Sequence, residues 1–102
     1  VDMLPFLQKE VLKIHEHGQV FDVGAGAGDV VDYALKNAPK GTTVNIEEPN
    51  TVMVQSYINK LKKYLNLKVG TVYEGPIQDY YCGQRKGIAP KRPQNLILAI
   101  HM

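Results

Sequence analysis

Hydrophobic side chains recur along this chain with two different spacings, which predict helices alternating with short apolar strands. Near the N-terminus they recur at steps of three and four residues: Leu4, Leu7, Val11 and Ile14. This spacing predicts an amphipathic helix over residues 5–17. Gly18 is well placed to end that helix in the left-handed conformation.

Two further helical patterns follow. The first ends near Pro39 and has four apolar positions on one side: Val30, Val31, Ala34 and Leu35. The second places Val54, Ile58, Leu61 and Leu65 inward and Lys60, Lys62 and Lys63 outward. Each pattern predicts a helix that packs its apolar side against a sheet.

Short, nearly continuous apolar runs between these helices predict strands at residues 19–23, 42–46, 68–73 and 95–100. A loop rich in Gly, Pro, Lys and Arg separates the last two strands, with at most one helical turn over residues 77–81. Strands that alternate with helices are parallel and joined by crossovers. The fold class is therefore α/β, with a parallel sheet and flanking helices, and the nearly continuous apolar strands predict that both faces of the sheet are covered.

The end of the first strand carries the most informative motif, a run in which glycine and alanine alternate: Gly24, Ala25, Gly26, Ala27 and Gly28. Glycines at this place allow a tight turn into the next helix and let the backbone approach a ligand. The N–H groups at the start of that helix are then available to the ligand. Glu48 follows twenty residues after Gly28, at the end of the second strand, where a carboxylate can accept two ribose hydroxyls.

The glycine spacing argues against a dinucleotide cofactor. A nicotinamide or flavin site has the pattern G-x-G-x-x-G, which would place its third glycine at the position of Asp29. The pattern here is G-x-G-x-G, with the acid Asp22 two residues before the first glycine and no basic residue beside the turn. These features favour a cofactor without a pyrophosphate.

This motif resembles the first motif of the Rossmann-like S-adenosylmethionine-dependent methyltransferases, and Glu48 with Pro49 resembles the ribose-binding acid of that family. The Glu-Pro pair and the Ile-His-Met ending are most similar to the histamine N-methyltransferase branch of small-molecule methyltransferases. The resemblance implies the sheet order 3-2-1-4 and S-adenosyl-L-methionine as cofactor. It implies that ten residues bind this cofactor: Asp22, Gly24, Ala25, Gly26, Gly28, Glu48, Pro49, Ile77, Gln78 and Ile100.

Several of these positions have a second interpretation. Glu47 could be the acid that points to the ligand, because neighbouring strand residues point to opposite faces. Asp22 could act structurally, by accepting hydrogen bonds from backbone N–H groups of the glycine turn. Ile77 and Gln78 could form an ordinary turn, and Ile100 could belong to the core. His101 is a weak catalytic candidate at the end of the fourth strand.

Composition narrows the class of protein. The 102 residues are 44% hydrophobic and 22% charged, which is typical of one globular domain. The net charge of +2 gives no reason to expect a nucleic-acid partner, and no apolar run approaches the ~20 residues that span a bilayer. The lone Cys82 favours a reducing compartment such as the cytoplasm.

These observations predict that residues 1–102 form a single cofactor-binding domain, incomplete at its C-terminal end and inactive alone. The expected partner is a small-molecule methyl acceptor, with an amine favoured by the resemblance. Two alternatives stay open: a non-catalytic, methyltransferase-like interaction module, and a dinucleotide-dependent oxidoreductase. The oligomeric state is not predicted.

Overall fold

The computed structural model describes residues 4–74 and 94–98, which form a four-stranded sheet with helices. In chain order its elements are α1 (Leu4–Leu12), β1 (Gln19–Val23), α2 (Asp29–Tyr33), the 3-10 turn η1 (Leu35–Asn37), β2 (Thr42–Glu47), α3 (Thr51–Leu61), β3 (Leu67–Tyr73) and β4 (Leu96–Leu98). The predicted strands therefore form, with bounds that differ by one or two residues. Residues 99 and 100 of the fourth predicted strand lie outside the described residues.

The sheet is parallel throughout and has the order β3-β2-β1-β4, as predicted. β1 occupies an inner position, and Val23 at its end pairs with Glu47 at the end of β2. All five residues of β1 are buried, which explains why this strand is apolar except at Gln19 and Asp22. The carboxyl ends of β1 and β2 consequently lie side by side.

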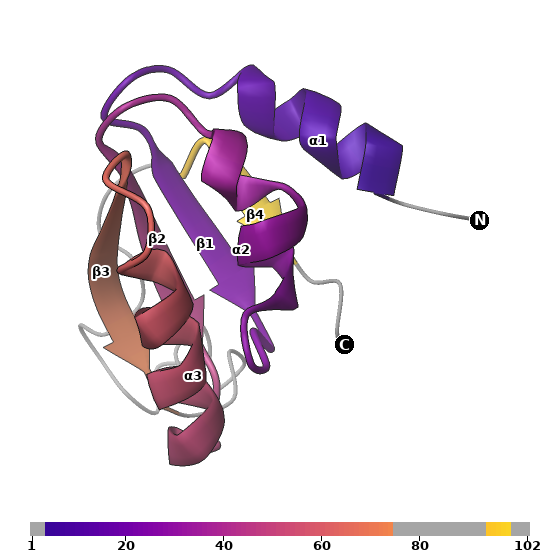
Figure 1. Ribbon diagram of the computed structural model, residues 1–102. Coiled ribbons are helices and arrows are strands. Elements are labelled where there is room, and N and C mark those ends of the chain that lie inside the picture. The colour runs from indigo at the N-terminus through magenta and orange to yellow at the C-terminus, as the bar shows by residue number, and fades with distance from the viewer. Residues whose placement is uncertain (1–3, 75–93, 99–102) are drawn as a thin grey trace.

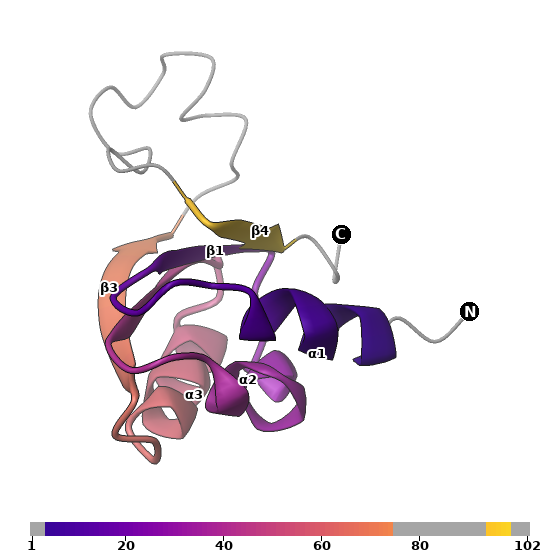
Figure 2. The ribbon, with the colours of Figure 1, turned by 90° about the horizontal axis from the view of Figure 1, so that it is seen from above.

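Figures 1 and 2 show α1, α2 and α3 on one face of the sheet, so within the described residues the prediction of helices on both faces is wrong. The core fills the layer between them and this face of the sheet. It includes the fully buried Val11 of α1, Val31 of α2, Tyr57 and Leu61 of α3, and Val20 of β1. Burial of these apolar side chains is the main force that holds the helices on the sheet.

The first helix is shorter than predicted, and its end is built differently. α1 stops at Leu12, and the chain then tightens, because Ile14 N donates to the oxygen of Val11 rather than continuing the α-helical pattern. The left-handed residue is His17, with φ 61°, and not Gly18. Gly18 is required for a different reason: a Cβ there would lie 2.5 Å from Cγ2 of Ile14.

The other two helices also end early. The second predicted helix is interrupted at Ala34, whose φ of −142° is not helical, and continues as η1 so that Leu35 remains fully buried. α3 ends at Leu61, so Leu65 lies beyond the helix and is fully exposed rather than inward. The apolar spacing therefore identified the buried sides but not the helix ends.

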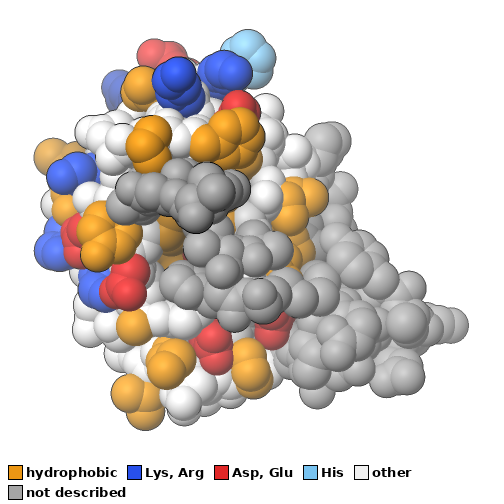
Figure 3. All heavy atoms as spheres, turned by 90° about the vertical axis from the view of Figure 1, so that its right-hand side faces the viewer, with side chains coloured by type: hydrophobic (Ala, Val, Ile, Leu, Met, Phe, Trp, Pro, Cys, Tyr) orange, Lys and Arg blue, Asp and Glu red, His pale blue; other side chains and the backbone are white. Residues whose placement is uncertain are grey.

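On the face drawn in Figure 3, charged side chains of both signs are interspersed with hydrophobic ones. Large hydrophobic side chains that are exposed in the described structure include Phe6, Leu12 and Tyr33. No helix in the described part of the chain has the length and apolar character needed to cross a lipid bilayer.

Candidate functional site

The turn after β1 adopts the conformation that its glycines predict. Gly24, Gly26 and Gly28 all have positive φ, at 63°, 64° and 91°. Side chains with a Cβ rarely adopt this region, so the alternation of glycine and alanine matches the alternation of the backbone. The turn leads directly into α2, which has only five residues. The electrostatic attraction of a helix N-terminus is therefore a smaller contribution here than the sequence suggested.

Two acids at the end of β2 hold this turn. Oε1 of Glu47 accepts a hydrogen bond from the N–H of Gly24 at 2.9 Å, and Oε1 of Glu48 accepts one from Gly26 at 2.9 Å. The N–H of Ala25 donates to the backbone oxygen of Glu47, also at 2.9 Å. Three consecutive amides of the turn are thus satisfied by β2, and are not the free donors that the glycine motif alone implies.

Glu48 does more than hold the turn. Its Oε2 accepts a hydrogen bond from the N–H of Asn50 at 2.9 Å, and Asn50 caps α3 by accepting from Val52 N and Met53 N. The carboxylate of Glu48 therefore links the glycine turn to the start of α3. Pro49 lies between Glu48 and Asn50, within this connection.

Asp22 lies at the same end of the sheet, next to last in β1, and is 1% exposed. Its Oδ2 accepts a hydrogen bond from the hydroxyl of Tyr57 at 2.8 Å. Its Oδ1 has no hydrogen-bond partner, and is the one buried side-chain oxygen or nitrogen in the described residues of which this is true. An unsatisfied buried oxygen costs about 1–3 kcal/mol, so this arrangement is not explained by stability.

Burial raises the pKa of Asp22 from 3.8 to about 7. The hydrogen bond from Tyr57 opposes this shift, and the negative charges of Glu47 and Glu48 add to it. Burial also raises the pKa of Glu47, with a contribution from Glu48, while the hydrogen bond from Gly24 lowers it. Three neighbouring carboxyl groups, two of which bind the turn, therefore favour a ligand that donates hydrogen bonds or carries positive charge.

Tyr57 of α3 supports the turn from the helical side. A Cβ at Gly28 would lie 3.0 Å from Cα of Tyr57 and 3.1 Å from Cγ of its ring. Gly28 is therefore needed for the close approach of α3 to the turn, rather than for access of a ligand. Ser56 adds a second contact, because its hydroxyl donates to the oxygen of Ala27 at 3.2 Å.

The carboxylate of Glu48 retains capacity for a ligand. An ionised carboxylate offers about four acceptor positions, and the described structure uses two of them, for Gly26 and Asn50. Two remain, which is the number that the two hydroxyls of a ribose require. Glu48 therefore has acceptor positions for two neighbouring hydroxyls, such as those of a ribose.

The structure brings together seven of the ten predicted cofactor residues, Asp22 to Gly28 and Glu48 with Pro49, at one edge of the sheet. Ile77, Gln78, Ile100 and the catalytic candidate His101 lie outside the described residues. The interpretation that Asp22 accepts hydrogen bonds from the glycine turn was wrong. The turn donates to Glu47 and Glu48, and Asp22 accepts from Tyr57 instead.

Sequence reasoning treated Glu47 and Glu48 as alternatives and did not single out Tyr57. Both acids contact the turn because β2 ends at Glu47, so the alternation of a strand no longer applies to Glu48. Tyr57 was detectable. It lies three residues after Val54 on the inward side of α3, and a buried tyrosine needs a partner for its hydroxyl.

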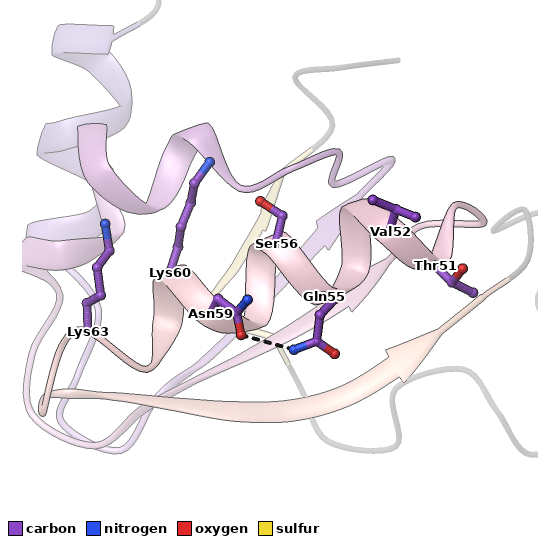
Figure 4. A pocket seen from close by; sticks show the side chains of 7 residues that line it. All are labelled: Thr51, Val52, Gln55, Ser56, Asn59, Lys60 and Lys63. Carbon is purple, nitrogen blue, oxygen red and sulfur yellow. Dashed lines mark hydrogen bonds between the residues drawn. The ribbon is translucent and has the colours of Figure 1, made fainter.

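A separate open groove of about 720 Å³ runs along α3. Figure 4 shows its lining side chains: Thr51, Val52, Gln55, Ser56, Asn59, Lys60 and Lys63. Lys60 and Lys63 are engaged with Asp29 and Asp32, both at 3.3 Å. The groove includes none of the predicted cofactor residues, and most of its lining side chains belong to the exposed side of α3.

Within residues 4–74 and 94–98 there is no cluster of three or more His, Cys, Asp or Glu side chains suited to a metal ion. A scan of this chain against protein-family models found no match. A search of curated proteins also found no match.

Proposed function

We propose that the carboxyl end of β1 and β2 binds S-adenosyl-L-methionine, and that the chain is the cofactor-binding part of a methyltransferase that acts on a small molecule. The observation that carries this proposal is the contact between the glycine turn and the buried acid of the next strand, Gly26 N to Glu48 Oε1 at 2.9 Å. In an open parallel sheet this is the edge at which nucleotide ligands bind.

Each part of the edge has a role in this proposal. The two acceptor positions of Glu48 that the described residues leave unused hold the ribose hydroxyls, and the turn from Gly24 to Gly28 lies against the methionine end of the cofactor. Pro49 fixes the backbone beside Glu48. Ile77 and Gln78 are proposed to contact the adenine and Ile100 to cover the cofactor, on the basis of the sequence resemblance.

The cofactor supplies a methyl group on a sulfonium, ready for transfer to a nucleophilic atom. The contribution of the chain is to bind, orient and exclude water, since this transfer depends mainly on alignment of the reactants at about 3–3.5 Å. The acceptor is proposed to be a small molecule, with an amine favoured by the resemblance, and His101 is proposed to border it. Acidic groups at this edge suit a positively charged cofactor.

Calorimetric titration of the full chain with S-adenosylhomocysteine tests the proposal. We expect micromolar binding by the wild type. Glu48→Ala removes the acceptor for two hydroxyls and should weaken binding by roughly 10- to 100-fold, as expected for charged hydrogen bonds. The control Glu16→Ala, at an exposed site before β1, should bind like the wild type.

Thermal unfolding of each variant shows whether it is folded before titration. Absence of binding by folded wild type, or equal binding by wild type and Glu48→Ala, would contradict the proposal. Competition with an adenine dinucleotide separates it from an oxidoreductase, because the G-x-G-x-G spacing predicts no displacement of S-adenosylhomocysteine by that compound.

A further inference from the structure

Glu47 contacts the glycine turn through two different atoms. Its carboxylate oxygen Oε1 accepts from Gly24 N, and its backbone oxygen accepts from Ala25 N, both at 2.9 Å. The pairing of Val23 with Glu47 in the sheet brings Glu47 directly opposite the start of the turn. The second contact depends only on the backbone, whereas the first depends on the side chain.

Burying the Glu47 side chain lowers the stability of the fold. The residue is 4% exposed, it lies next to the second acid Glu48, and burial raises its pKa. One hydrogen bond from a backbone amide offsets only part of the cost of burying a carboxylate. An apolar side chain at this strand end would avoid that cost and the repulsion from Glu48. Stability therefore does not explain a glutamate at this position.

We propose that Glu47 is a positioning residue for the cofactor: its carboxylate fixes Gly24 so that the turn keeps the shape in which Glu48 and the turn can take the ligand together. The proposal rests on the proposed function for the identity of the ligand. Glu48 can serve the ligand because Glu47 takes over part of the task of holding the turn. This division explains why two consecutive acids reach the same turn.

Two substitutions at this position separate the side-chain contact from general stability. Glu47→Met has a similar length but no strong acceptor, whereas Glu47→Gln keeps an amide oxygen that can accept from Gly24. Glu16→Gln at an exposed position is the matched control. Hydrogen exchange of single amides is measured without ligand, and affinity for S-adenosylhomocysteine is measured by calorimetry.

In Glu47→Met we expect the Gly24 amide to exchange at least about tenfold faster, because it loses its acceptor. The Ala25 amide keeps its acceptor, the backbone oxygen of Glu47, and should change by less than about threefold. Affinity should fall about 5- to 10-fold in Glu47→Met and return to within about threefold of wild type in Glu47→Gln. The control should match the wild type in both measurements.

A general loss of stability would speed Gly24 and Ala25 equally, and that result would overturn the proposal. Unchanged Gly24 exchange, or unchanged affinity in Glu47→Met, would also overturn it. If the wild type does not bind S-adenosylhomocysteine, the proposed function fails. In that case exchange at Gly24 still decides whether Glu47 holds the turn.

Discussion

Two groups of buried polar side chains lie in this sheet, and they are built in opposite ways. One is centred on Asn45 in the middle of β2. Its Nδ2 donates to Oε1 of Gln19, Oε1 of Gln94 and the oxygen of Val20, and its Oδ1 accepts from Thr71 N. The other is the acidic group at the carboxyl end, formed by Asp22, Glu47 and Glu48.

The amide network around Asn45 is neutral, and it connects β1, β2 and β3 with Gln94, two residues before β4. It also accounts for an irregularity in the sheet. The register between β2 and β3 shifts between Val44 and Ile46, and Oδ1 of Asn45 takes the N–H of Thr71 at that point. A Cβ at Gly70 would lie against the same oxygen, which explains the glycine there. The donor and acceptor groups of the Asn45 side chain both have partners and carry no net charge, as a purely structural role requires.

The acidic group has the opposite character. It carries charge, Oδ1 of Asp22 has no partner among the described residues, and the pKa values of Asp22 and Glu47 are raised. The comparison teaches that buried polarity alone does not mark a site. Incomplete satisfaction and accumulated like charge are the features that separate the candidate site from the structural network. Four substitutions test this distinction, and they follow in order of expected effect.

Asn45→Ala should produce the largest change. It removes a donor and an acceptor shared by four segments and leaves the N–H of Thr71 without a partner. We expect the free energy of unfolding to fall by about 2–4 kcal/mol at pH 5 and at pH 8 alike, measured by urea denaturation. Affinity for S-adenosylhomocysteine should stay within about twofold of wild type.

Asn59→Ala is the matched control, because Asn59 forms one exposed hydrogen bond with Gln55 and should matter little. A loss of stability in Asn45→Ala that appears at only one of the two pH values would contradict the view that the network is neutral.

Asp22→Asn should remove a pH dependence of stability. The pKa of Asp22 is about 7 in the folded state, against 3.8 for an aspartate in the unfolded chain, so the folded state holds the proton more strongly. Its contribution to stability is therefore fully present below about pH 4 and is lost as the pH rises towards about 7. The shift sets an upper limit of about 4 kcal/mol, and we expect about 1–3 kcal/mol.

At pH 8 Asp22→Asn should consequently be more stable than the wild type, and the difference should shrink as the pH falls towards 4, measured by urea denaturation across this range. Asp29→Asn, at an exposed acid, is the control. A difference between wild type and Asp22→Asn that is constant with pH would show that the carboxyl group does not titrate in this window.

Tyr57→Phe keeps the ring beneath Gly28 and removes only the hydroxyl that donates to Asp22. We expect a loss of about 1–2 kcal/mol, larger at pH 8 than at pH 5, because the ionised carboxylate needs the donor more than the protonated form does. Tyr33→Phe on the surface is the control. Equal losses at both pH values would mean that the hydroxyl does not affect the protonation of Asp22.

Lys63→Met should have the smallest effect. Lys63 lies 3.3 Å from Asp32 with both side chains largely open to water, and Asp32 also accepts from the hydroxyl of Tyr64 at 2.6 Å. We expect a change below about 0.5 kcal/mol in thermal or urea unfolding. A loss above about 1 kcal/mol would mean that charge on the surface matters as much as the buried groups.

The sequence was sufficient for the sheet because each strand is a short run rich in apolar and β-branched residues that lies between helical patterns or loops. The inner strand at residues 19–23 has no exposed residue, and only Gln19 and Asp22 in it are polar, whereas the edge strand β3 is partly exposed. Helix ends were less predictable because they depend on contacts with distant segments. His17, rather than Gly18, takes the left-handed conformation, and its N–H donates to the oxygen of Lys40, 23 residues away.

The glycine turn and its acid were visible in the sequence because both requirements are local: positive φ in the turn and an acid at a strand end. The hydrogen-bond partners of Glu47 and Tyr57 were not visible, because each contact depends on the approach of another element. Tyr57 reaches Asp22 across 35 residues of chain, and Glu47 reaches Gly24 across 23. Packing of β2 and α3 against β1 decides both contacts.

The most direct test of the distinction between the two polar groups is an amide NMR titration of the full chain with S-adenosylhomocysteine. We predict that the resonances of Gly24, Gly26, Glu48 and Asn50 shift, while those of Asn45 and Thr71 keep their positions. Shifts centred on the amide network, or no shifts in a folded chain, would contradict the assignment of the acidic group as the binding site.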